Sequence, residues 1–99
     1  MTLEDYREQL DAVDKALEEN FVRRMRIVDE IGAYKRANGL PTLDAGREAK
    51  VLEKHASAAE DELKPYMRDF FRALMNISKS YQDSKRAVSG VCAECDKTK

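Results

Sequence analysis

The first third of the sequence carries apolar residues at alternating spacings of three and four. The series runs without a break through Leu3, Tyr6, Leu10, Val13, Leu17, Asn20, Arg24, Ile27, Ile31 and Tyr34. This spacing predicts one amphipathic helix from about Leu3 to Ala37. Such a helix is about 50 Å long, whereas a compact globule of about 100 residues has a radius of gyration of about 13 Å. A chain of 99 residues cannot cover both ends of that rod, so we expect a partner, most simply a second copy of the chain.

Two polar residues interrupt the apolar series. Asn20 is typical of a polar residue that sets the register in a helix bundle. Burying the Arg24 guanidinium without an anion is costly, so Arg24 alone indicates a salt bridge or a side chain that extends its charged end to water. Only the rest of the chain can favour a binding role for Arg24.

The composition fits a single all-α domain with a modest core. Charged residues make up 37% and hydrophobic residues 42% of the chain, with four Gly and two Pro. The net charge of −1 argues against a general binder of nucleic acids or membrane surfaces, which needs a basic excess. No apolar run approaches the ~20 residues of a membrane span, and the first residues lack the pattern of a secretory signal. We therefore expect a cytoplasmic location.

Two further helices follow the first. Gly39 and Pro41 mark its end, because glycine adopts a left-handed cap and proline cannot continue the helix. Asp44 is a candidate N-cap for a second helix that ends near Ala59; its inner stripe is Ala45, Ala49, Leu52, Ala56 and Ala59. Pro65 suits the start of a third helix, which carries the heaviest apolar load: Met67, Phe70, Phe71, Leu74, Met75, Ile77 and Tyr81. The predicted order is long, short, long.

The last residues differ in composition from the rest. We predict a helical domain over residues 1–87 and a flexible polar tail over residues 88–99. Cys92 and Cys95 have the spacing of half a zinc site or of a redox pair. The chain has no other cysteine, and its single histidine, His55, is far away in sequence, where we interpret it as an ordinary helix residue. We expect an inert tail, with no metal and no cofactor.

Arg24 and Lys35 share one face of the first helix. Eleven steps of about 100° return the chain to within about 20°, with the two backbones about 16 Å apart. Two long cations at that separation can clamp an anion of small-metabolite size. Arg7 lies on nearly the same face but about 42 Å from Lys35, so it can serve only a partner's pocket. The residues of this candidate pocket include no nucleophile paired to a base, no metal-ligand spacing and no phosphate loop. We therefore expect chemistry that needs only orientation and electrostatic stabilisation of a dianion.

An ordered set of residues resembles the all-helical class of chorismate mutases over about residues 3 to 85. The matching positions are Arg7, Leu10-Asp11-Ala12-Val13-Asp14, Arg24, Ile31-Gly32-Ala33-Tyr34-Lys35, Pro41, Asp44, Arg47-Glu48, Ser78 and Gln82. The resemblance implies an intertwined homodimer of three-helix chains with two active sites, each completed by one arginine of the other chain. The implied reaction is the [3,3] rearrangement of chorismate to prephenate in phenylalanine and tyrosine biosynthesis, without a covalent intermediate.

The resemblance also implies a role for each site residue. Arg24 and Arg7 of the partner subunit would hold the two carboxylates of chorismate. Lys35 would contact a carboxylate and the ether oxygen, and Gln82 would hydrogen-bond the same ether oxygen. Glu48, aided by Asp44, would bind the ring hydroxyl, and Ser78 would bind a carboxylate. Arg47 would shape the electrostatics of the site.

Two other functions fit the same sequence. Isochorismate-pyruvate lyases share the three-helix dimer of the chorismate mutases and form salicylate. The polar set at Asp44, Glu48, Ser78 and Gln82 looks more like that of a mutase. A catalytically silent regulatory or interaction module is the second alternative. Its weakness is that an idle cluster of buried cations is a liability for stability.

Overall fold

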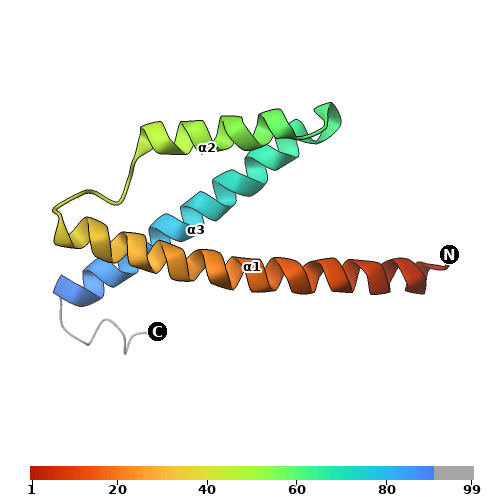
Figure 1. Ribbon diagram of the computed structural model, residues 1–99, viewed down its shortest axis with the longest axis horizontal. Coiled ribbons are helices and arrows are strands. Elements are labelled where there is room, and N and C mark those ends of the chain that lie inside the picture. The colour runs from red at the N-terminus through yellow and green to blue at the C-terminus, as the bar shows by residue number, and fades with distance from the viewer. Residues whose placement is uncertain (91–99) are drawn as a thin grey trace.

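The computed structural model describes residues 1–90, which form three α-helices and one 3₁₀ turn (Figure 1). The elements are α1 (Leu3–Ala37), α2 (Ala45–Ala58), η1 (Asp61–Leu63) and α3 (Lys64–Gly90). Helix α3 contacts both other helices, crossing behind the C-terminal half of α1 and meeting α2 beyond the η1 turn. The all-α fold and the order long, short, long are confirmed.

Both ends of α1 are capped by short-range hydrogen bonds. Thr2 Oγ1 accepts from the Asp5 backbone N–H at 3.2 Å, and the Asp5 carboxylate accepts from the Thr2 N–H at 2.8 Å. At the other end, Gly39 has φ +67°, the left-handed conformation that ends a helix at little cost for glycine. The predicted bounds of this helix are confirmed.

Asp44 caps α2 as predicted, because its Oδ1 accepts a hydrogen bond from the Arg47 backbone N–H at 3.0 Å. The predicted inner stripe is only partly right. Ala56 is fully buried, and Leu52 and Ala59 are half-buried, but Ala45 and Ala49 are exposed. The reason is that α2 and α3 diverge from the η1 turn (Figure 1), so the N-terminal half of α2 does not lie against α3 as its C-terminal half does.

Helix α3 begins one residue before Pro65 and ends at Gly90. The predicted domain boundary at residue 87 thus lies inside this helix, three residues before its end. Cys92 and Cys95 lie outside the described residues. His55 stacks on Phe71, with ring centroids 3.9 Å apart and planes within 2°, as suits a packing residue of α2.

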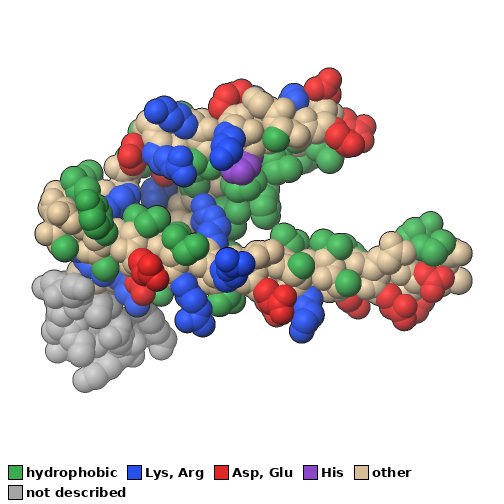
Figure 2. All heavy atoms as spheres, in the orientation of Figure 1, with side chains coloured by type: hydrophobic (Ala, Val, Ile, Leu, Met, Phe, Trp, Pro, Cys, Tyr) green, Lys and Arg blue, Asp and Glu red, His purple; other side chains and the backbone are tan. Residues whose placement is uncertain are grey.

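The core is small and lies along α3, where that helix contacts α2 and the C-terminal half of α1. Its buried apolar residues are Val28, Ala56 and Met75. In contrast, every residue from 1 to 23 is exposed. The apolar stripe of α1, which we define as Leu3, Tyr6, Leu10, Val13 and Leu17, is 49–63% exposed. Figure 2 shows hydrophobic side chains along this half of α1 and on the facing side of α2 and α3, with open space between them.

The overall dimensions agree with the argument from helix length. The described chain measures 54 × 32 × 19 Å, with a radius of gyration of 17.3 Å, well above the ~13 Å of a compact chain of this length. The excess comes from the N-terminal half of α1, which projects beyond the other two helices (Figure 1). Within residues 1–90, none of the helices combines the length and the apolar content that crossing a membrane requires.

Candidate active site

A cavity of about 280 Å³ opens between α1, the start of α2 and α3. Its volume is close to the lower limit for small-molecule sites, so it suits a small metabolite. Nine of its twelve lining residues have polar or charged side chains. The lining residues are Arg24, Ile31, Lys35, Thr42, Asp44, Arg47, Glu48, Val51, Met75, Ser78, Lys79 and Gln82.

Arg24 links α1 to α3 at one wall of this cavity. Its Nη1 donates a hydrogen bond to Ser78 Oγ at 2.6 Å, and Ser78 Oγ donates in turn to the Leu74 carbonyl oxygen at 2.9 Å. Ser78 is buried, whereas Arg24 is only half-buried. This chain of hydrogen bonds fixes the direction of a cation that also borders open space, which is the arrangement needed to receive an anion.

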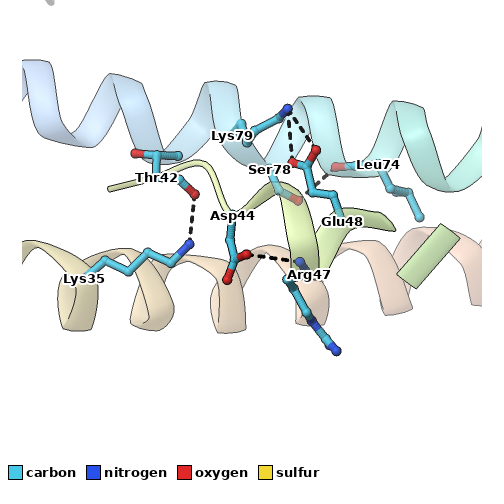
Figure 3. Close-up of polar contacts among 8 residues, drawn as sticks. All are labelled: Lys35, Thr42, Asp44, Arg47, Glu48, Leu74, Ser78 and Lys79. Atoms are coloured by element: carbon cyan, nitrogen blue, oxygen red, sulfur yellow. Dashed lines mark hydrogen bonds and ion pairs between the residues drawn. The ribbon is translucent and has the colours of Figure 1, made fainter. Parts of the chain in front are cut away.

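Lys35 lies at the other end of the same face of α1. Its Nζ donates to the Thr42 carbonyl oxygen at 2.8 Å (Figure 3). Thr42 belongs to the connector between α1 and α2. Arg86 of α3 also holds this connector, because its Nε donates to Thr42 Oγ1 at 2.8 Å and its Nη2 contacts the Leu40 carbonyl oxygen. The connector between α1 and α2 is therefore held from both sides, and it fixes Lys35 at the cavity wall.

Glu48 and Lys79 form an ion pair between the first turn of α2 and the middle of α3. Lys79 Nζ lies 3.0 Å from Glu48 Oε2 and 3.3 Å from Oε1. Figure 3 shows the two side chains pointing toward one another across the gap between the helices. Their side chains are 26% and 28% exposed, so the pair is half-buried in the cavity wall.

Gln82 is the most buried polar group of the site, at 7% exposure. Its Nε2 donates to the Val28 carbonyl oxygen on α1 at 3.1 Å. The two helices approach closely here because Gly32 has no side chain. A Cβ at Gly32 would lie 3.2 Å from Gln82 Cγ, which is tighter than nearly all real contacts of this kind. The glycine thus allows the close approach of a second element.

Seven of the eight predicted site residues line this one cavity: Arg24, Lys35, Asp44, Arg47, Glu48, Ser78 and Gln82. Asp44 and Arg47 are exposed at its rim. The eighth, Arg7, is not among the lining residues of its own chain. Its side chain is 64% exposed and pairs with Glu4 at 3.7 Å in the unpacked half of α1. This position agrees with the argument that Arg7 cannot serve the pocket of its own chain.

Two polar lining residues escaped the sequence reasoning, Lys79 and Thr42. A signal for Lys79 was present. The residues at 75, 78, 79, 82 and 86 follow the three–four spacing of one helix face, and that face borders the cavity and its connector. Thr42 takes part through its backbone carbonyl oxygen, which any residue type would supply, so its identity carries no signal.

The charges of the lining favour an anion. Four cationic side chains (Arg24, Lys35, Arg47 and Lys79) face two carboxylates (Asp44 and Glu48), a net charge of +2. Over the described range 1–90, no three His, Cys, Asp or Glu side chains lie together as a metal site would need. The arrangement can hold a small dicarboxylate between fixed cations and present hydrogen-bond donors to its interior.

Comparison with known proteins agrees with this geometry. The family model described as chorismate mutase type II matches residues 6–83. The T-protein of Enterobacter agglomerans is 35% identical over 81 residues, which cover 80% of this chain and 22% of that protein. The T-protein of Haemophilus influenzae is 29% identical over 79 residues, which cover 70% of this chain and 21% of that protein. The chain thus spans about a fifth of the length of these relatives.

No solved structure matches the chain at a significant level. The family match extends from the exposed half of α1 to one residue beyond Gln82, and it includes every residue found at the cavity. On this match and the polar cavity that it spans, the chain belongs to the chorismate mutase type II family.

Proposed function

We propose that this chain is an isomerase that rearranges chorismate to prephenate. The observation that carries the proposal is the cavity, in which seven residues of the expected set meet and whose lining has a net charge of +2. That charge is equal and opposite to the charge of a dicarboxylate substrate. Membership of the chorismate mutase type II family supports the same reaction.

In the proposed reaction, one carbon–oxygen bond breaks and one carbon–carbon bond forms within a single molecule. The ether oxygen leaves the ring carbon while the methylene carbon of the side chain joins the ring, and six electrons move in one cycle. No proton, electron or group enters or leaves. Such a reaction gains from a bound, folded substrate and from donors at the oxygen where negative charge grows.

Arg24 and Ser78 supply the binding of one carboxylate. The Arg24–Ser78 hydrogen bond at 2.6 Å supports this role, because it holds the Arg24 guanidinium at one wall before a ligand arrives. The single O–H of Ser78 is donated to the Leu74 carbonyl oxygen, so Ser78 binds a carboxylate only when its hydroxyl turns away from that oxygen. Charged donors of this kind bind carboxylates about twice as strongly as neutral ones. Arg7 of the partner subunit supplies the second carboxylate contact, and Arg47 at the rim adds to the positive field.

Lys35 and Gln82 act at the ether oxygen. An ammonium group has three N–H donors. Lys35 directs one of them to the Thr42 carbonyl oxygen, which leaves two for a ligand. The Gln82 amide has two N–H donors, of which one meets the Val28 carbonyl oxygen. Both groups are held in place by the protein itself, so they cost little reorganisation as charge develops.

Glu48 and Asp44 accept the hydrogen bond of the ring hydroxyl. Both are carboxylates that line the cavity at the start of α2, Asp44 at its rim and Glu48 half-buried in its wall. They orient the ring, so that the cationic wall meets only the carboxylate ends of the substrate. The proposed binding therefore matches acceptors to the hydroxyl and donors to the acids.

The proposal includes a homodimer, and the expected cytoplasmic location stands with it. The apolar stripe of α1 is 49–63% exposed and faces further hydrophobic side chains on α2 and α3 across open space (Figure 2). A second α1 laid antiparallel in that space would cover the stripe. It would also bring Arg7 of the partner subunit toward the cavity.

The first experiment is to follow chorismate by its ultraviolet absorbance in the presence of the purified protein and to identify the product. We expect prephenate. Failure to convert chorismate would contradict the proposal, and formation of salicylate from isochorismate would replace it with the lyase reaction.

A second experiment tests the shared site. Arg7→Ala and Arg24→Ala should each abolish most activity, because each removes a carboxylate contact. Unfolding and refolding the two variants together in equal amounts produces mixed dimers in which one of the two sites has both arginines. Random pairing makes half of the dimers mixed, so about a quarter of the wild-type activity should return. Activity that stays at the level of the separate variants would contradict the shared site.

A further inference from the structure

Lys79 lines the cavity but has no part in the proposed function as stated so far. It lies in the middle of α3, next to Ser78, and its ammonium group bridges both oxygens of Glu48 at 3.0 and 3.3 Å. With 28% of its side chain exposed, it is held in the wall and does not extend into solvent. A lysine in this place changes what Glu48 can do.

Glu48 alone would be a poor neighbour for a dianion. Its carboxylate borders the same small cavity as Arg24 and Lys35 of α1. Asp44 and Arg47, at the start of α2, border this cavity as well. Without Lys79, the lining would have three cations against two carboxylates, a net charge of +1. A carboxylate there would repel the substrate or turn away from the cavity. Lys79 offsets this charge and fixes its position.

The pairing also limits which ligand groups Glu48 can accept. An ionised carboxylate has about four lone-pair sites and no donor. Lys79 occupies one site on each oxygen, and the remaining sites can accept a hydrogen bond from a donor of the ligand. A ligand without a hydroxyl at this point leaves a carboxylate in the wall without its second partner, which costs free energy. A site built in this way rejects analogues that lack the donor.

We propose that Lys79 is a specificity-determining residue: it holds Glu48 as a fixed hydrogen-bond acceptor, so that the cavity selects a dicarboxylate that has a hydroxyl group opposite Glu48. This inference rests on the proposed mutase function. Lys79 itself acts through Glu48 and is a positioning residue, and the selected group is the ring hydroxyl of the substrate.

The test compares chorismate with its deoxy analogue, which lacks the ring hydroxyl, in the wild type and in Lys79→Met. Methionine keeps most of the length of lysine and removes the charge. We expect kcat/KM for chorismate to fall roughly tenfold, chiefly through a higher KM, because a contact made equally in ground and transition states is lost. The ratio of kcat/KM between chorismate and the deoxy analogue should fall as well, by less than kcat/KM for chorismate itself, because the lost positive charge weakens the binding of both dicarboxylates. Lys79→Arg should restore most of both values.

A matched control is available on the same helix. Lys85 pairs with Asp29 of α1 at 3.6 Å, does not line the cavity, and is 42% exposed. Lys85→Met removes one interhelical ion pair of α3 without touching Glu48, so it should leave KM and the substrate ratio unchanged. Thermal melting of both variants reports any loss of packing.

The outcomes separate the two proposals. A wild-type protein that does not convert chorismate overturns the mutase function and this inference with it. Equal losses for chorismate and the deoxy analogue in Lys79→Met, with an unchanged ratio, would reduce Lys79 to a structural tether between α2 and α3 and would overturn the inference alone. Wild-type kinetics in Lys79→Met would do the same.

Discussion

Replacing Gly32 by alanine should damage catalysis much more than folding. Gly32 lies on α1 opposite Gln82, and an added Cβ would lie 3.2 Å from Gln82 Cγ and 3.7 Å from its Cδ. It would also lie 3.3 Å from Arg36 Nη1, a buried nitrogen that has no hydrogen-bond partner among the described residues. Gln82 must therefore shift by a few tenths of an ångström, and its amide moves with it.

The two effects on stability partly cancel. Alanine is favoured over glycine inside a helix by about 1 kcal/mol, whereas an extra methyl group in a packed contact costs about 1–3 kcal/mol. The free energy of unfolding should therefore fall by at most about 2 kcal/mol, or roughly 10 °C in Tm for a chain of this size. Catalysis has no such compensation, because a misplacement of 1 Å can cost about 100-fold in rate, and a few tenths of an ångström scale to a smaller loss. We expect kcat to fall several-fold, up to about tenfold.

The assay is chorismate turnover beside thermal melting. Gly46→Ala is the matched control, because a Cβ at Gly46 would meet only Asp44 Oδ1 at an ordinary 3.7 Å. It should raise stability slightly and keep wild-type kcat. A Gly32→Ala protein with wild-type kcat and higher Tm would refute the reasoning, since it would mean that Gln82 does not depend on the space above Gly32.

Four other changes test separate parts of the structure. Gln82→Ala should lower kcat by orders of magnitude at a stability cost of about 1 kcal/mol, and turnover near wild type would remove Gln82 from the site. Arg86→Gln should speed amide hydrogen exchange in the connector between α1 and α2 and raise KM, because Lys35 loses its fixed support. Exchange at wild-type rates would show that Arg86 does not hold the connector in place. Ala56→Leu should lower the free energy of unfolding by about 1–3 kcal/mol in urea, since Ala56 is fully buried, and an unchanged midpoint would contradict the tight α2–α3 contact. Leu10→Asp should produce a monomer in sedimentation experiments, and a dimer with this change would place the interface elsewhere.

The predictions from the sequence were most accurate for features that depend on a single helix. The bounds of α1 came out as expected because an unbroken three–four spacing ends at a strong stop, Gly39, whose φ is indeed positive. Arg24 and Lys35 meet one cavity because eleven residues are close to three full turns. Both results depend on helix geometry alone and need no knowledge of neighbouring elements.

The sequence predicted less where two helices cross. Ala45 and Ala49 have the spacing of an inner stripe, yet they are exposed because α2 diverges from α3. The Glu48–Lys79 ion pair depends on the same divergence, because the angle between α2 and α3 sets the separation that the two side chains must span. A charged residue on a helix is normally a solvated one. Glu48 was predicted as a site residue only through the family resemblance, and its pairing with Lys79 could not be predicted without the crossing of the two helices.

The unpacked half of α1 has a thermodynamic consequence. Residues 1–23 are exposed throughout, so in an isolated chain little burial offsets the conformational entropy lost on forming this half of the helix. A second copy that covers it would couple folding to association by mass action. The melting temperature should then rise with protein concentration. Dilution should lower activity per chain at the same time, because in the proposed dimer the arginine that completes each site departs with the other subunit.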